Sequence, residues 1–216
     1  MPDPNHPTLA LLAGGRGTRM GLPKSHLTIA SVPILRHLFD NWAWPGPTLL
    51  ITAPGVEHPP GHDLFTAEII DPVEGQGPLR GVHTALTHAT TDLVIVATVD
   101  MPKVARAHLD HLAAAITSFS NAPALFLHPP FSRDPQGERQ RSPQASAPPP
   151  DNPFFEPFPC AVRRTLLLPI IAARLARNDL SVRALATEPG VITRPAPRDW
   201  PADTWANWNR PEDVRA

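Results

Sequence analysis

The sequence predicts an α/β fold with a mostly parallel sheet, and two observations lead to that prediction. Short apolar strand patterns alternate with helical patterns between residues 8 and 116, which is typical of βαβ units with right-handed crossovers. Proline accounts for 30 of the 216 residues, and because proline ends helices, a mostly helical bundle is excluded. The length predicts one domain over residues 1–216, long enough to bury a core.

Strands are predicted where short apolar runs are bounded by turn residues. Residues 8–12 form such a run and lead directly into a glycine-rich loop, as a buried parallel strand does. Residues 92–99 (DLVIVATV) form the clearest strand, because the run is continuous and rich in β-branched side chains. Further strands are predicted at residues 48–52, 68–70 and 191–193.

Helices are predicted where apolar residues recur at helical spacing. Four segments show this pattern, at residues 33–42, 79–89, 105–116 and 161–177. The last is amphipathic and rich in arginine, which favours a core-packed helix with a basic outer side over a membrane-bound helix. A short helix beginning at Pro211 is predicted in the C-terminal tail.

The regular pattern breaks down between His128 and Pro159, where ten prolines are mixed with polar residues. No periodicity survives in that stretch. A flexible, proline-rich insertion is therefore predicted at about residues 129–152, rather than a second domain.

Charge, cysteine content and hydropathy exclude several classes of function. Nineteen Lys and Arg balance twenty Asp and Glu, for a formal net charge of −1, so no global attraction to nucleic acid or anionic lipid is expected. The one cysteine, Cys160, cannot form an internal disulfide. The first apolar run is too short to span a membrane and lacks the basic region of a signal peptide. We therefore expect a soluble cytoplasmic protein in which any anion site is local.

The loop after the first strand concentrates the residues that carry chemistry. Residues 11–24 read LLAGGRGTRMGLPK, and their four glycines allow several backbone N–H groups to surround one anion. Arg16, Arg19 and Lys24 add three cations within nine residues, so the composition predicts a phosphate-handling loop. The spacing matches neither a Walker P-loop nor a dinucleotide fingerprint, which disfavours a P-loop ATPase or an NAD enzyme. The alternative is a plain glycine-rich turn with solvated arginines.

Two aspartates follow predicted strands. Asp100 lies just past the clearest one, and open α/β sheets bind ligands at the carboxyl ends of their strands. Mg²⁺ prefers one or two carboxylates with phosphate oxygens and water, so Asp100 is predicted to hold Mg²⁺ against an α-phosphate. The alternative, that Asp100 caps the helix near Ala105, is weakened by the intervening Pro102 and Lys103. Asp71 is equally consistent with ligand contact and with an ordinary Asp-Pro turn.

The remaining polar residues predict less. The sequence has ten histidines, but no Cys/His cluster is assigned metal-ligand spacing; His83 and His88 lie five apart on a helix and do not share a face. Asn207 and Asn209 have the character of capping residues before a helix that starts at Pro211.

The segment Leu-Ala-Gly-Gly-x-Gly-x-Arg-Met-Gly-x-x-Lys at residues 12–24 resembles the signature of nucleotidyltransferases with the sugar-nucleotide fold. It is most similar to that of the molybdenum cofactor guanylyltransferase family. The resemblance implies a three-layer α/β/α, Rossmann-like nucleotidyltransferase fold with a mostly parallel sheet. It also implies that the start of the loop contacts the base and ribose while Lys24 lies on the triphosphate. The implied nucleotide-binding residues are Leu12, Ala13, Gly14, Gly15, Gly17, Lys24, Asp71 and Asp100.

Three further segments agree with this family in order and spacing. Asp71 followed by GPLRG at residues 77–81 is similar to a family motif near the nucleotide. TVDMP at residues 98–102 resembles a motif whose aspartate, here Asp100, holds magnesium. The tail NWNRPED at residues 207–213 resembles a motif that places Asn207 and Asn209 on the acceptor side. The chain departs from the family at three positions, which are Ser31, Lys103 and Arg210.

The resemblance implies transfer of GMP from GTP to molybdenum-molybdopterin, with Mg²⁺ as cofactor and with Arg19, Lys24 and Asp100 as catalytic residues. No covalent intermediate is needed, because the acceptor phosphate is already a nucleophile; the enzyme positions the groups and neutralises charge. Two alternatives stay open. One is a related transferase that uses CTP or a sugar phosphate, and the other is a non-catalytic nucleotide-binding homologue. The joint presence of the two cations and Asp100 argues against the second.

Overall fold

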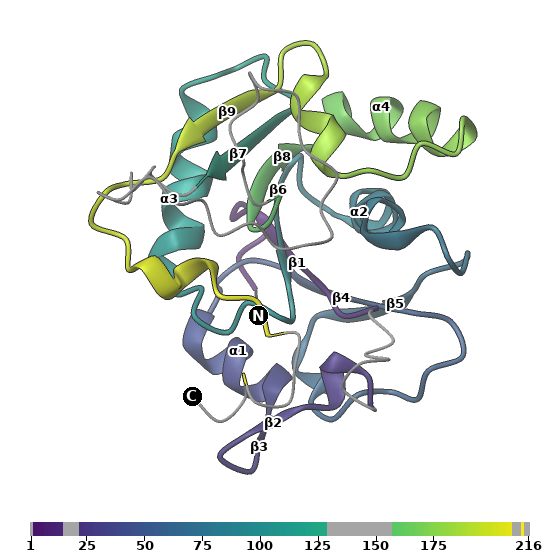
Figure 1. The fold of residues 1–216 in the computed structure, drawn as a ribbon, viewed down its shortest axis with the longest axis vertical. Helices are drawn as coiled ribbons and strands as arrows, with labels where there is room; N and C mark the ends of the chain where they lie inside the picture. Colours follow the sequence, from purple (N-terminus) through teal and green to yellow (C-terminus); the bar gives the residue numbers. More distant parts are fainter. Residues whose placement is uncertain (1, 15–21, 129–156, 209–212, 214–216) are drawn as a thin grey trace, which may run out of the picture.

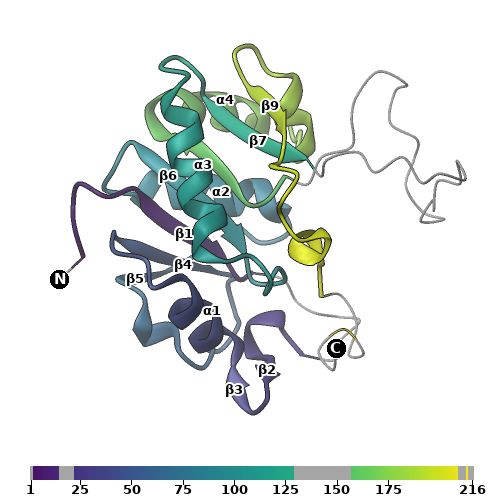
Figure 2. The same ribbon diagram turned by 90° about the vertical axis from the view of Figure 1, so that its left-hand side faces the viewer.

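A computed structural model describes residues 2–14, 22–128, 157–208 and 213. Its centre is a seven-stranded sheet in the order β5-β4-β1-β6-β8-β7-β9, with helices on both faces. Figure 1 shows α2 and α4 side by side on one face, and Figure 2 shows α1 and α3 in front of the other. This confirms the predicted three-layer, mostly parallel α/β class. The predicted insertion at 129–152 and the predicted helix at Pro211 lie outside the described residues.

Four parallel strands form the first half of the sheet. They are β5 (Ala67–Ile70), β4 (Thr48–Thr52), β1 (Thr8–Leu12) and β6 (Leu93–Thr98), each within one residue of its predicted limits. Every residue of β1 and β4 is buried, which explains why these strands appear in the sequence as unbroken apolar runs. From β1 the chain passes to β4 and β5 on one side of β1, and it then crosses to β6 on the other side. The sheet therefore has a topological switch point at β1, where open α/β sheets bind ligands.

The second half of the sheet corrects one prediction and adds one strand. Residues 160–163 (β8, Cys160–Arg163) form a strand antiparallel to both β6 and β7, so the start of the helix predicted at 161–177 is wrong. Its helical part is α4 (Arg164–Ala176). The segment β7 (Ala124–His128), which we did not predict, is entirely buried. The strand predicted at 191–193 is β9 (Ile192–Pro195), which pairs in parallel with β7.

The other helices lie close to their predicted positions. They are α1 (Ile34–Trp42), α2 (Gly77–His88) and α3 (Arg106–Thr117). Helix α2 begins two residues earlier than predicted, because Gly77 and Pro78 already form its first turn, where proline is tolerated. The short elements are η1 (Lys24–His26), β2 (Thr28–Ile29), β3 (Val32–Pro33), η2 (His62–Leu64), η3 (Arg183–Thr187) and η4 (Ala202–Trp205). No helix of the described residues is long and apolar enough to cross a membrane.

The hairpin before α1 contains Ser31, one of the three positions singled out in the sequence. Ala30 and Ser31 join β2 to β3 with φ values of 47° and 68°. Two consecutive positive φ values are typical of a type I′ turn, in which Gly, Asn and Asp are favoured. Ser31 therefore adopts a backbone conformation that glycine would adopt without strain.

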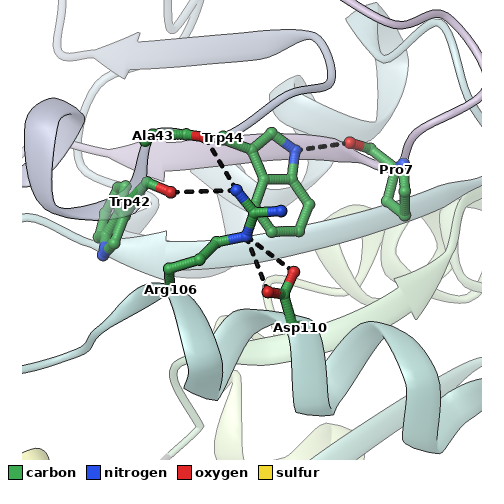
Figure 3. A network of polar contacts seen from close by, with 6 residues as sticks. All are labelled: Pro7, Trp42, Ala43, Trp44, Arg106 and Asp110. Atoms are coloured by element: carbon green, nitrogen blue, oxygen red, sulfur yellow. Dashed lines mark hydrogen bonds and ion pairs between the residues drawn. The ribbon is translucent and has the colours of Figure 1, made fainter.

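Arg106 ties the start of α3 to the end of α1 (Figure 3). Helix α1 ends at Ala43, its C-cap, which has a φ of 39°. The last carbonyl groups of any helix have no partner within the helix. The Arg106 guanidinium donates to the Ala43 oxygen at 2.8 Å and to the Trp42 oxygen at 3.3 Å, while its Nε binds Asp110 at 2.8 Å. It also lies over the Trp44 ring, 4.9 Å from the centroid. Both helices on this face of the sheet are thereby fixed to each other.

Candidate active site

A cavity of about 710 Å³ opens at the carboxyl ends of β1, β4, β5 and β6. This is the switch-point edge, where ligands of open α/β sheets bind. The structure brings five of the predicted site residues to its wall, from four separate parts of the chain: Leu12, Gly14, Lys24, Asp71 and Asp100. The cavity is large enough for a nucleotide-sized ligand, because small-molecule sites typically measure about 300–1,000 Å³.

The other predicted site residues have different positions. Ala13 is buried outside the cavity wall and donates its N–H to the Ile51 oxygen at 2.8 Å, so it extends β1 against β4. Asn207 precedes Trp208, whose backbone N–H donates to the backbone carbonyl oxygen of Asp100 at 2.8 Å. This part of the tail therefore runs beside the Asp100 backbone. The predicted residues Gly15, Gly17, Arg19 and Asn209 lie outside the described part of the chain.

Lys24 and Asp100 form an ion pair at the cavity wall. Lys24 opens the short turn η1, and its Nζ lies 2.8 Å from Asp100 Oδ2. Their side chains are 17% and 23% exposed, so both charges are partly removed from solvent. A capping role for Asp100 is excluded, because Ala105 caps α3 and donates its N–H to His108 Nδ1 at 3.0 Å. The carboxylate of Asp100 thus faces a cation and the cavity.

Asp71 combines a structural role with a place in the cavity wall. Its N–H donates to the Thr52 oxygen at 2.8 Å, which extends the β4–β5 pairing past the end of the strands. Its Oδ1 accepts a hydrogen bond from the Thr84 hydroxyl and lies 3.9 Å from Arg80 Nε. Burial raises the pKa of Asp71 above its ordinary value of 3.8, although Thr84 and Arg80 each act to lower it. Keeping this carboxyl group ionised in the folded protein therefore costs free energy, and protonation to the neutral acid would remove that cost.

This cost predicts a pH-dependent effect of Asp71→Asn on stability. The pKa of Asp71 is raised in the folded state. The stability that Asp71 contributes is therefore complete when the pH is below its unfolded-state pKa, and it is lost as the pH rises through its folded-state pKa. Asp71→Asn should therefore have a higher Tm than the wild type at pH 7, and this difference should shrink as the pH falls toward 4. Thermal unfolding at a series of pH values measures it. The exposed Asp40→Asn serves as the control, and a wild type more stable than Asp71→Asn at pH 7 would contradict the prediction.

The N-terminus of α2 forms a wall of the cavity that our sequence reasoning only partly identified. Gly77 has a φ of 63° and Gln76, which precedes it, has a buried Oε1 with no hydrogen-bond partner in the described residues. Gly81 packs against β1, where an added Cβ would lie 3.3 Å from Leu12 Cδ2. Glycine thus lets the helix approach the strand closely. The partial positive charge of the helix N-terminus favours an anionic ligand in this cavity.

Ala53 and Pro54 also line the cavity, although the sequence analysis did not single them out. They directly follow β4, as Asp71 directly follows β5, and Asp100 lies two residues after the end of β6. The signal that identifies them is their position after a buried parallel strand, since such positions meet at one edge of the sheet.

The sequence matches the MobA-like NTP transferase domain over residues 9–188. It is 30% identical to a probable molybdenum cofactor guanylyltransferase of Deinococcus radiodurans over 96% of this chain and 91% of the other. It is 29% identical to the molybdenum cofactor guanylyltransferase of Vibrio cholerae over 86% of this chain and 79% of the other.

Solved structures share the fold at lower identity. Molybdopterin-guanine dinucleotide biosynthesis protein A from Archaeoglobus fulgidus superimposes with a TM-score of 0.72 at 19% identity, covering 96% of this chain and 95% of that one. The 2-C-methyl-D-erythritol 4-phosphate cytidylyltransferase of Thermus thermophilus gives a TM-score of 0.63 at 18% identity, covering 95% and 94%. Because the sequence match spans most of the chain and the sheet and cavity agree with it, the chain belongs to the MobA-like NTP transferase family and is a nucleotidyltransferase.

Proposed function

We propose that this protein transfers GMP from GTP to molybdenum-molybdopterin. The observation that carries the proposal is the Lys24–Asp100 pair, which stands 2.8 Å apart in the wall of a cavity at the switch point of the sheet. Transfer of a nucleotidyl group is favoured by a cation that offsets phosphate charge and by a carboxylate that can hold Mg²⁺, and this pair offers both. The choice of GTP and of the acceptor is supported by relatives at 29% and 30% identity that are named molybdenum cofactor guanylyltransferases.

The reaction is a single displacement at phosphorus. An oxygen of the acceptor phosphate attacks the α-phosphorus of GTP and forms a new P–O bond. The bond between the α-phosphorus and its bridging oxygen breaks, and pyrophosphate leaves with the electron pair. Both reactants carry negative charge, so the protein contributes chiefly by holding them in line and offsetting that charge.

The residues divide this work between them. Lys24, together with Arg19, is proposed to neutralise charge on the departing pyrophosphate. Leu12 and Gly14, at the end of β1, are proposed to contact the base and ribose, with Ala13, Gly15 and Gly17 supplying backbone beside them. Asp71 and the N-terminus of α2 border the same cavity. On the acceptor side we propose Asn207 and Asn209; Asn207 lies next to the residue that binds the Asp100 backbone.

Asp100 is also the residue that would hold Mg²⁺. Its carboxylate meets a cation already, it lines the cavity, and a hard oxygen ligand beside phosphate oxygens suits this ion. When bound, Mg²⁺ would stabilise the charge that develops on the phosphate oxygens. In the absence of substrate, Lys24 neutralises the same carboxylate and keeps Asp100 from standing as an uncompensated charge.

Pyrophosphate release with each of the four nucleoside triphosphates tests this function. Each assay contains Mg²⁺ and either molybdenum-molybdopterin or a sugar phosphate, and mass spectrometry identifies the product. The expected result is turnover with GTP and the pterin acceptor, abolished by EDTA. A preference for CTP would move the nucleotide assignment, and turnover with the sugar phosphate would move the acceptor. Failure of every triphosphate to bind or react would overturn the proposal.

A further inference from the structure

A second cluster of titratable side chains lies at the β5 edge of the sheet, outside the lining of the cavity. We call His58, His62 and Glu68 the edge cluster. His58 lies in the loop after β4, His62 in η2 and Glu68 in β5. Each offers one ligand atom, and the three atoms lie within 4.8 Å of one another. The cluster corrects the expectation that no histidines have ligand spacing, because His58 and His62 lie four residues apart. The carboxylate could not be predicted from spacing, since it comes from a strand that pairing with β4 brings beside the two histidines.

Two of the three side chains are held in place by neighbouring groups. Glu68 is only 10% exposed, and its Oε1 accepts a hydrogen bond from the Thr52 hydroxyl at 3.0 Å. His62 places Nδ1 3.1 Å from the Pro59 carbonyl oxygen. A carbonyl oxygen only accepts, so the tautomer that matches this contact is the one with N–H at Nδ1, which leaves the lone pair of Nε2 for a metal ion. Such second contacts are what orients the ligands of metal sites in proteins.

The third side chain is the adjustable one. His58 is 63% exposed, with its Nδ1 2.6 Å from Glu68 Oε2 and its ring stacked on that of His62, the centroids 4.9 Å apart. Gly61, with a φ of 91°, makes the turn that leads into η2 and sets His62 beside this loop. The exposed imidazole can therefore rotate while the other two ligands stay where they are.

We propose that the edge cluster binds Zn²⁺ through two imidazoles and one carboxylate, with water completing the coordination. This donor set is one that Zn²⁺ takes in proteins, whereas Mg²⁺ prefers oxygen ligands alone. Zn–N and Zn–O bonds of about 2.0–2.2 Å place tetrahedral ligand atoms roughly 3.4 Å apart. The present separations, from 2.6 Å to at most 4.8 Å, bracket that value, and movement of His58 is enough to reach it.

The position of the edge cluster gives the bound ion a structural consequence. The loop that carries His58 begins with Ala53 and Pro54, which line the cavity, and the strand that carries Glu68 leads into Asp71. A metal ion would fasten the outer part of this loop to the edge strand. We therefore expect Zn²⁺ to raise the Tm and to slow hydrogen exchange in residues 53–62, whether or not the cavity holds a nucleotide.

Zn²⁺ titration of tag-free protein, in competition with a chromophoric chelator, tests the proposal. The expected result is one Zn²⁺ per chain that excess Mg²⁺ does not displace. Glu68→Gln keeps an oxygen for the Thr52 hydroxyl, and His62→Ala removes one imidazole. Each should weaken Zn²⁺ binding by more than the roughly 10- to 100-fold that loss of an outer-shell partner causes. His88→Ala, which removes an exposed histidine from α2, should bind Zn²⁺ as the wild type does.

Two further measurements separate a lost ligand from a damaged fold. Thr52→Val removes only the hydroxyl that holds Glu68 and should weaken Zn²⁺ binding about 10- to 100-fold. Co²⁺ should give the visible absorption of a four-coordinate site in the wild type, and Glu68→Gln should lack it while keeping the wild-type circular dichroism. Zn²⁺ binding that is equally tight in the wild type, Glu68→Gln and His62→Ala would overturn the proposal. So would displacement of Zn²⁺ by an equal concentration of Mg²⁺.

Discussion

Replacing Asp100 with asparagine is expected to lower the rate of pyrophosphate release from GTP about 100-fold or more, which is the scale of losing one preorganised electrostatic group. Asparagine keeps the size of the side chain but removes the charge that pairs with Lys24 and that would hold Mg²⁺. The neutral amide therefore leaves the developing phosphate charge less well compensated. Steady-state assays with GTP, Mg²⁺ and the pterin acceptor measure the effect.

The control for this variant is Asp40→Asn, because Asp40 forms an exposed pair with Arg36 on α1, a helix that contributes no residue to the cavity lining. Such surface pairs contribute little, so this variant should keep its activity. The Asp100→Asn protein should also need more Mg²⁺ for half-maximal rate. If it retained full activity at wild-type Mg²⁺ concentrations, the assignment of Asp100 would be lost.

Lys24→Met is expected to lower the same rate by a similar factor of about 100, but to act on metal binding in the opposite direction. Methionine keeps most of the side-chain stem and removes the ammonium group that lies 2.8 Å from Asp100 Oδ2. In the absence of nucleotide, that ammonium group competes with any divalent cation for the carboxylate. We therefore expect Lys24→Met to bind Mg²⁺ alone more tightly than the wild type, although it turns over more slowly.

Calorimetric titration of Mg²⁺ without nucleotide, alongside the rate assay, separates these two effects. Arg36→Met removes an exposed cation from α1 and should change neither quantity. A Lys24→Met protein with a normal rate would show that the residue serves only to neutralise Asp100. A Lys24→Met protein with unchanged Mg²⁺ affinity and a reduced rate would show that Lys24 and Mg²⁺ do not compete for the Asp100 carboxylate.

Three buried strands of the central sheet have the clearest local pattern in the sequence. β1, β4 and β6 appear as continuous apolar runs because both faces of the parallel sheet are covered by helices, so no solvent-facing side chain interrupts the pattern. The position of Asp100 at the cavity followed from the same reasoning, because it comes directly after the segment predicted as the clearest strand, residues 92–99. Glycine content and charge likewise identified the loop that ends at Lys24.

Other features depend on partners far away in the sequence. Residues 160–162 have apolar side chains that suit a helix as well as a strand, and they belong to β8 because they pair with β6 on one side and with β7 on the other. The same applies to β7, whose apolar run borders the proline-rich stretch and pairs only with strands that follow it in the chain. Strand pairing is decided by these long-range contacts, to which local propensity contributes little.

The sequence by itself thus determined the fold class and the position of the aspartate that follows the central strand, because each depends on residues adjacent in the chain. From the same kind of local pattern it predicts a phosphate-handling loop. Only the tertiary structure decided which charges meet. Lys24 reaches Asp100 across 76 positions, and His58 reaches Glu68 through the pairing of β4 with β5. The physical reason is that electrostatic contacts and metal-ligand sets depend on distances of a few ångströms, which the register of the folded sheet fixes.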